Sequence, residues 1–340
     1  MVYVPIQGIP PGGPRLRKAR RQKEGFSMIY GIADVGSNTV RLSIYKCEGG
    51  EIRLLMNRKT MAGLAGYVRH GALTPEGIEV ACQTLQGYRS LMDNLELPDL
   101  RVFATASLRN ISNTEEAVGA VMAATGLRVD VLSGREEAEL SFRGAIQNAG
   151  LYNGLLVDLG GGSTELVSYR SRAIQTACSL SVGSLSLFSR HVEKLWPDKG
   201  ERRAIRRAVE EQLDQFAPQR APARHICGVG GTVRAACKVA NVLFGRPAED
   251  RSLDRVELKE MLRRLKKPEK AELRLLLKTV PDRIHTIIPG LLALDTIVRA
   301  YGAQTITASA CGVREGYLLD RVLREPAVKP ANTAITEREG

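Results

Sequence analysis

Residues 155–169 read Leu-Leu-Val-Asp-Leu-Gly-Gly-Gly-Ser-Thr-Glu-Leu-Val-Ser-Tyr. The apolar start of this stretch predicts a buried strand that ends in Asp158. Residues 160–162 are glycines, and because glycine has no Cβ, their backbone N–H groups can approach a ligand closely. Such a loop suits phosphate oxygens, and Asp158 and Glu165 on its two sides suit a divalent cation. On its own, the stretch is equally compatible with a tight hairpin that contains ordinary turn glycines.

Two other stretches repeat this design. Residues 29–33 form a short apolar run that ends in Asp34, and glycine, hydroxyl and amide groups follow before a second strand at 39–45. Residues 226–232 lead another strand into glycines and a threonine. An internal repeat of this kind predicts a fold built from two similar halves whose ligand loops face each other.

Six motifs follow one another along the chain: Asp34-Val-Gly-Ser-Asn-Thr-Val-Arg41, Thr105-Ala-Ser-Leu-Arg109 with Asn113, Ser133-Gly-Arg-Glu-Glu-Ala138, Asp158-Leu-Gly-Gly-Gly-Ser-Thr-Glu165, Gly228-Val-Gly-Gly-Thr232 and Gly312-Val-Arg-Glu-Gly316. In this order they resemble the exopolyphosphatase / guanosine pentaphosphate phosphohydrolase (Ppx/GppA) family over about residues 28–325. The resemblance implies an α/β protein with the duplicated actin-like ATPase (ribonuclease H-like) fold. Two lobes with mixed five-stranded sheets would enclose a central cleft, without a C-terminal helical domain.

The expected organisation follows from this resemblance and from composition. Residues 1–27 are rich in proline, glycine and arginine and predict a disordered basic extension. Residues 28–133 would form lobe I and residues 134–311 lobe II. The last helix, at about 312–324, could pack back on lobe I. Residues 325–340 would form a flexible tail.

Composition limits the partners. The net charge of +12 favours polyanions. Nucleic acid is the generic interpretation of such a charge, but no helix-turn-helix, zinc-finger or aromatic-laced RNA motif supports a specific nucleic-acid partner. No run is apolar enough to span a bilayer and no secretory h-region opens the chain, so we expect a cytoplasmic protein without membrane contact. The six scattered cysteines predict reduced thiols, and a homodimer is left open.

Several helices are predicted from periodicity. One opens at Thr74 with Leu95 on its apolar stripe, and another runs from Ser184 to Trp196. Residues 201–216 predict an amphipathic helix with Phe216 inward, and residues 255–279 a continuous basic helix. The outer face of the 201–216 helix would carry its arginines: Arg202, Arg203, Arg206 and Arg207. Charge runs of this kind predict either a solvated face or a shared groove.

The neighbouring residues Glu136 and Glu137 are expected to have different roles. Ser133 and Glu136 have the spacing of a capping box, which gives Glu136 a structural role at the start of a helix. Glu137 has no such local role. The resemblance aligns Glu137 with the residue thought to be the catalytic base of the family, and Glu136 is the second choice.

The resemblance also implies a phosphate site and a metal. Arg109 would stabilise charge on the phosphate oxygens. Mg²⁺ would be held by Asp158 and Glu165, with Asp34 nearby. Phosphate would contact residues of three loops: Gly36, Ser37, Asn38, Arg41, Gly160, Gly161, Gly162, Ser163, Thr164, Gly230, Gly231 and Thr232. At Arg283-Ile-His285 the chain departs from the usual Arg-Ala-Asp of the family, and we interpret His285 as structural.

The implied reaction is hydrolysis of a terminal phosphate with Glu137 as general base. The substrate is inorganic polyphosphate or guanosine pentaphosphate (pppGpp); the basic charge favours polyphosphate, and the short chain favours short polymers or the nucleotide. A small-molecule kinase of the same fold group and a non-catalytic phosphate or nucleotide sensor remain alternatives. The Ser133–Ala138 pattern with Glu137 argues against the kinase, and the two glutamates together with Arg109 argue against the sensor.

Overall fold

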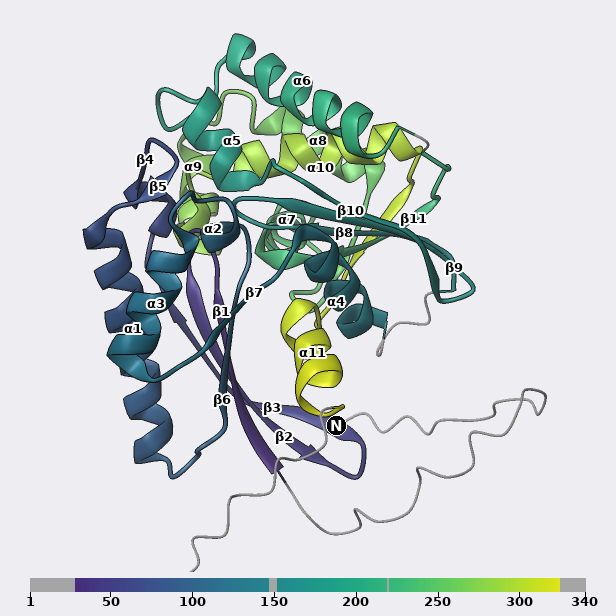
Figure 1. The fold of residues 1–340 in the computed structure, drawn as a ribbon. Coiled ribbons are helices and arrows are strands. Elements are labelled where there is room, and N and C mark those ends of the chain that lie inside the picture. The colour runs from purple at the N-terminus through teal and green to yellow at the C-terminus, as the bar shows by residue number, and fades with distance from the viewer. Residues whose placement is uncertain (1–27, 147–151, 219, 325–340) are drawn as a thin grey trace, which may run out of the picture.

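The structure is a computed structural model that describes residues 28–146, 152–218 and 220–324. The two segments predicted to be a disordered extension and a flexible tail, 1–27 and 325–340, lie outside the described residues. Two separate sheets organise the rest (Figure 1). No helix in the described ranges has the length and apolar character needed to cross a bilayer.

The first sheet has the strand order β3-β2-β1-β6-β7. Its first three strands are antiparallel neighbours, and β6 and β7 run parallel to β1. The strands are β1 (Met28–Val35), β2 (Val40–Glu48), β3 (Glu51–Thr60), β6 (Leu100–Ala104) and β7 (Val129–Val131). A separate small ribbon pairs β4 (Val68–Arg69) with β5 (Ala72–Leu73) after the 3-10 turn η1 (Leu64–Tyr67).

The second sheet repeats this order as β10-β9-β8-β11-β13 and adds one strand, β12, at its edge. Again three antiparallel strands are followed by two parallel ones. This repeat is the duplicated actin-like fold. The prediction of five strands was wrong for this sheet. A sixth strand, β12, pairs with β13, and its Leu253 is buried opposite Ile306. The strands are β8 (Gly154–Leu159), β9 (Thr164–Arg170), β10 (Ala173–Leu180), β11 (His225–Val229), β12 (Ser252–Asp254) and β13 (Thr305–Ala308).

Helices α1 (Pro75–Asn94) and α3 (Thr114–Thr125) cover one face of the first sheet, and short α2 (Ala106–Arg109) follows β6. Thr74 caps α1 by accepting a hydrogen bond from the Gly77 N–H, and proline occupies the first helical position as predicted. The apolar stripe of α1 is buried except for Leu95, which lies just past the helix and is exposed.

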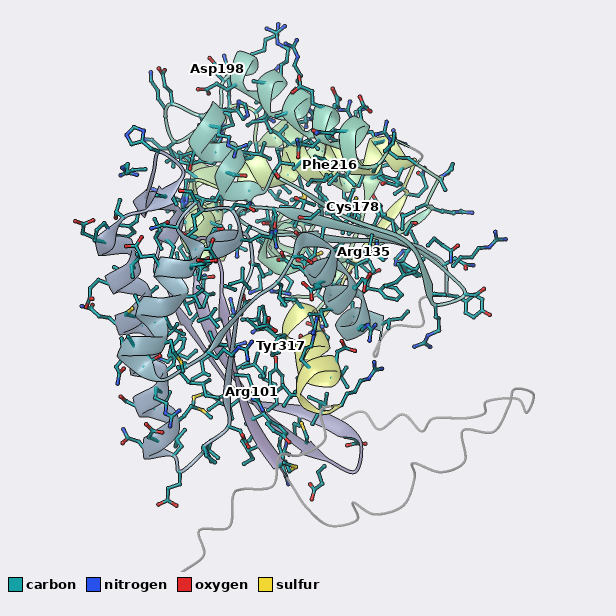
Figure 2. The ribbon with its side chains drawn as sticks, in the orientation of Figure 1. Arg101, Arg135, Cys178, Asp198, Phe216 and Tyr317 are labelled. Atoms are coloured by element: carbon teal, nitrogen blue, oxygen red, sulfur yellow. The ribbon has the colours of Figure 1, made fainter. Side chains whose placement is uncertain are left out.

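The helices on one face of the second sheet correct three expectations. Helix α5 ends at His191, because Val192 is extended. The predicted helix over 255–279 is two helices, since Pro268 disfavours helical geometry at the preceding residue. Phe216 is exposed at the end of α6 (Figure 2). The elements are α5 (Ser184–His191), α6 (Lys199–Phe216), α7 (Gly230–Phe244), α8 (Arg255–Arg264), α9 (Lys270–Thr279), η2 (Pro281–Arg283) and α10 (Ile287–Tyr301).

The arginines of α6 do not all lie on an outer face. Arg202 donates to the carbonyl oxygens of Leu262 and Leu265, and Arg206 pairs with Asp295 at 2.5 Å. These contacts attach α6 to α8 and α10. Their guanidinium groups therefore stabilise packing within the lobe.

Helix α4 (Gly134–Ile146) and the last helical segment, α11 (Val313–Tyr317) with the π-helical turn η3 (Leu318–Val322), lie between the two sheets (Figure 1). Helix α4 packs on the second sheet through a buried cluster that includes Phe142. The last segment packs on the first sheet. Tyr317, labelled in Figure 2, lies with its ring 4.8 Å from that of Phe103 on β6.

Candidate active site

Two matching turns form the centre of the site. In the first lobe the Gly36 N–H donates to the Thr39 carbonyl at 3.0 Å, and in the second the Gly160 N–H donates to the Ser163 carbonyl at 3.0 Å. Each turn joins a strand whose second-to-last residue is an aspartate to its antiparallel partner. The turns also touch: a Cβ on Gly162 would lie 2.6 Å from Ser37 Oγ. A side chain at position 162 would displace Ser37, because the loops of the two lobes meet there.

A third turn, between β11 and α7, closes the same space. Gly230 has a φ of +91°, and a Cβ there would lie 2.9 Å from Asp158 Oδ1. A Cβ on Gly231 would lie 2.0 Å from a guanidinium nitrogen of Arg283. These close approaches allow backbone, carboxylate and guanidinium groups to crowd around one small space.

The pocket between these turns has a volume of about 160 Å³. Such a pocket is smaller than the roughly 300–1,000 Å³ of sites that enclose drug-sized ligands. Most of the predicted residues line it: Asp34, Gly36, Ser37, Asn38, Arg41, Glu137, Asp158, Gly160, Gly161, Gly162, Ser163, Glu165, Gly230 and Gly231. The geometry therefore suits the reacting end of a substrate, with the remainder extending outside.

Four carboxylates gather in this pocket: Asp34, Glu137, Asp158 and Glu165. Burial is the main cause that raises the pKa of each one, and it brings Asp34 to about 6 and Glu137 to about 7. The neighbouring carboxylates add to the effect, because like charges disfavour each other's ionisation.

Hydroxyl and guanidinium groups hold three of these carboxylates in place. Ser141, one turn after Glu137 on α4, donates to Asp158 at 2.5 Å, and Ser179 donates to Glu165 at 2.8 Å. Arg109 Nη1 donates to Glu137 Oε2 at 2.8 Å. The carboxylates are therefore held in fixed orientations before any ligand binds.

Four arginines line the pocket, and three of them were not predicted from the sequence. Arg41 was expected; the others are Arg234 on α7, Arg283 on η2 and Arg314 on α11. Burial, with Arg314 nearby, lowers the pKa of Arg234 to about 10, so its guanidinium still carries its charge at neutral pH. Arg314 belongs to one of the quoted motifs, and that position was the available signal for it.

Four predicted site residues do not line the pocket. Glu136 forms the expected capping box with Ser133 and also accepts from Arg321 at 2.6 Å. The hydroxyls of Thr164 and Thr232 are used inside the fold, on the Val182 carbonyl and Ser184 Oγ. The fourth, Arg109, bonds to Glu137 and to the Leu132 carbonyl.

His285 also lies outside the pocket. Its ring contacts that of Phe188 edge-to-face, with 5.2 Å between ring centroids. Burial, followed by the neighbouring charge of Arg283, lowers the pKa of His285. The ring therefore packs between α5 and the start of α10 as a neutral side chain, in agreement with a structural role.

The donor set suits a hard divalent cation. Among the described residues, no group of three or more histidine, cysteine or acidic side chains is arranged to hold a metal by itself. Mg²⁺ needs less, since it commonly binds one or two carboxylates, substrate phosphates and waters. Asp158 and Glu165 are cross-strand neighbours on β8 and β9 and both line the pocket. They would fit that arrangement.

Known proteins resemble this chain in sequence and in fold. The profile of the Ppx/GppA phosphatase family matches residues 43–325. A Ppx/GppA protein of Aquifex aeolicus is 25% identical, with a TM-score of 0.72 over 88% of this chain and 99% of its own. An exopolyphosphatase-like protein is 25% identical, with a TM-score of 0.77 over 86% of this chain and 97% of its own.

An exopolyphosphatase of Cytophaga hutchinsonii, 22% identical, shares the fold with a TM-score of 0.75 over 86% of this chain and 97% of its own. The family profile covers both glycine loops of the second lobe, the glutamate pair and the pocket arginines from Arg234 onward. The chain belongs to the Ppx/GppA phosphatase family.

Proposed function

We propose that this protein is an exopolyphosphatase, which removes the terminal phosphate of inorganic polyphosphate by attack of water. The observation that carries the proposal is one small pocket with a buried glutamate, two glycine turns and four arginines on its walls. Two of the solved relatives are described as an exopolyphosphatase and an exopolyphosphatase-like protein. The basic charge of the chain favours a repeating polyanion.

In the proposed mechanism, backbone N–H groups of the turns at 36–38 and 160–163 surround the terminal phosphoryl group. Arg41, Arg234, Arg283 and Arg314 supply positive charge from the other sides. Preorganised donors and cations of this kind stabilise the charge on the phosphoryl oxygens in the transition state. Mg²⁺, held by Asp158 and Glu165, would neutralise further charge on these oxygens.

Glu137 would act as the general base. A pKa of about 7 keeps much of this carboxylate ionised at neutral pH and leaves it basic enough to accept a proton. The water oxygen would form the new bond to phosphorus while the bridging oxygen to the shortened chain leaves, and the water proton would pass to Glu137. Arg109 would orient Glu137 through its hydrogen bond to Oε2.

The decisive experiment compares substrates at fixed ionic strength. Phosphate release is measured from polyphosphates of several lengths, pppGpp and ATP, for the full chain and for a chain that starts at Met28. We expect the highest kcat/KM with polyphosphate of short to medium length and a steep decrease with salt. A pppGpp efficiency above that of every polyphosphate length would overturn the choice of polyphosphate and favour the nucleotide.

A further inference from the structure

The last helix is connected to β2 of the first lobe through two successive residues. Arg314 Nη1 donates to Ser43 Oγ at 2.6 Å, and Arg314 Nε lies 4.0 Å from Asp34 Oδ2. Ser43 is fully buried in β2, and its hydroxyl lies beneath the guanidinium of an arginine that lines the pocket. A pocket residue that follows the last strand of the second sheet is therefore held by the first lobe.

Glu315 makes the second connection. One carboxylate oxygen accepts from the Gly312 N–H at 2.7 Å and caps its own helix, and the other accepts from Tyr45 Oη at 2.5 Å. Tyr45 is buried. Burial, followed by the charge of Glu315, raises the pKa of Tyr45, so the phenol remains a proton donor.

The opposite side of the helix is fixed as well. A Cβ on Gly144 of α4 would lie 2.0 Å from the Gly312 carbonyl oxygen, and one on Gly316 would lie 1.8 Å from the Leu140 carbonyl oxygen. Helices α4 and α11 therefore cross with their backbones in contact. Ser43 and Tyr45 are two positions apart on β2 and face the same side of the strand, toward this helix pair.

We propose that Ser43 and Tyr45 are positioning residues that hold Arg314 against the phosphate pocket. Arg314 would bind the oxygens of a phosphate chain, so the inference rests on the proposed function for the identity of its anion. An arginine fixed before binding loses less conformational freedom when the anion arrives, which increases affinity. Ser43 supplies the direct contact, and Tyr45 fixes the first turn of α11 through Glu315.

The test is a double-mutant cycle on binding of tripolyphosphate, measured by calorimetry in the Glu137→Gln background, where the ligand persists. We expect Tyr45→Phe and Ser43→Ala each to weaken binding by up to about tenfold. After Arg314→Ala, neither change should weaken binding further, because coupled residues are not additive. Tyr30→Phe is the matched control: its hydroxyl bonds to the Met28 sulfur at the start of β1, and its loss should leave affinity unchanged.

Kinetics with Glu137 intact give a second measurement. Tyr45→Phe should raise KM for polyphosphate, whereas simple loss of folded protein would lower the apparent kcat and leave KM unchanged. Equal weakening with and without Arg314, or no effect of Arg314→Ala on tripolyphosphate binding, would overturn the proposal. If no polyphosphate is hydrolysed, the proposed function fails, and the binding cycle still decides whether Ser43 and Tyr45 position Arg314.

Discussion

At the scale of single residues, two neighbouring glutamates have different environments. Glu136 takes part in the capping box, and 43% of its side chain is exposed. Glu137 is one helical step further, and the rotation of about 100° per residue directs it into the pocket. There it is buried and bonded to Arg109. Position on the helix therefore separates a structural carboxylate from the candidate base.

Glu137→Gln is expected to reduce phosphate release by about 10²–10⁴-fold, since the amide cannot accept the water proton. Binding of long polyphosphate should remain largely intact because the pocket arginines are unchanged. Glu136→Gln is the control and should retain most turnover. Near-normal turnover of Glu137→Gln together with an inactive Glu136→Gln would reverse the assignment.

The pH profile should report the same group. Burial raises the pKa of Glu137 to about 7, and the base must be ionised to work, so kcat/KM should be full above this pH and fall as pH decreases through it. The positive charge of Arg109 lowers this pKa. Arg109→Gln should therefore move the acidic limb to higher pH, and an unshifted limb would exclude Glu137 as its source.

Asp158 is expected to contribute to the metal requirement. Its carboxylate lies beside Glu165 across β8 and β9 and is oriented by Ser141. Asp158→Asn removes a hard anionic ligand, so the Mg²⁺ concentration needed for half-maximal activity should rise. Titration of activity with Mg²⁺ measures this, with Asp214→Asn on the exposed face of α6 as a control outside the pocket. An unchanged titration would exclude Asp158 as a ligand.

At the scale of elements, the crossing of α4 and α11 brings residues from both helices into one site. Helix α4 carries Glu137 and Ser141, and α11 carries Arg314. Glycines at 144 and 316 allow the two backbones to touch. The buried cluster of Tyr45, Phe103, Leu140, Tyr317 and Leu318 then joins both helices to the first sheet. The carboxylate of Glu137 on α4 and the guanidinium of Arg314 on α11 thereby reach the same pocket.

Gly144→Ala should destabilise the protein by about 1–3 kcal/mol, because the added methyl would overlap the Gly312 carbonyl and force the helices apart. Gly87→Ala on α1 is the matched control. A Cβ at Gly87 would meet no atom within 4 Å, so alanine should stabilise by about 0.5–1 kcal/mol through helix propensity. Urea unfolding measures both. Equal stability of the two variants would contradict the close crossing.

At the scale of the whole molecule, the pocket exists only where the two lobes meet. Gly162 and Ser37 bring the glycine turns into contact, and Lys59 at the end of β3 forms an ion pair with Asp282 beside the pocket residue Arg283. The ion pair is partly exposed and joins the lobes at the edge of the site. Its contribution to stability is therefore small, about 0–1 kcal/mol.

The same pair should also affect substrate binding. Lys59→Asp alone would place two carboxylates opposite each other and remove positive charge beside the pocket, so it should raise KM for polyphosphate by about 2- to 5-fold, equivalent to roughly 0.5–1 kcal/mol. The double exchange with Asp282→Lys restores an attractive pair with unchanged net charge and should recover KM. Failure of the double exchange to recover KM would show that the individual charges matter and the connection between lobes does not.

The sequence alone was sufficient for features whose partners are near in the chain. The strands that carry Asp34 and Asp158, the cap at Thr74 and the capping box at Ser133 depend on residues a few positions apart. The structure agrees with each, except that both strands run one residue past the aspartate. The repeated strand-and-glycine pattern also predicted the duplicated fold. Local periodicity gave two wrong predictions. Phe216 is exposed and does not point inward, and the predicted helix over 255–279 is interrupted around Pro268.

Only the tertiary structure decided which charges share the pocket. Arg234, Arg283 and Arg314 reach it from three elements of the second half of the chain, and Arg109 bonds to a glutamate 28 residues away. Thr164 and Thr232 resemble phosphate ligands in sequence, yet their hydroxyls bond within the fold. Hydrogen-bonded turns are encoded by neighbours, whereas the direction of a long side chain depends on the packing of distant elements around it.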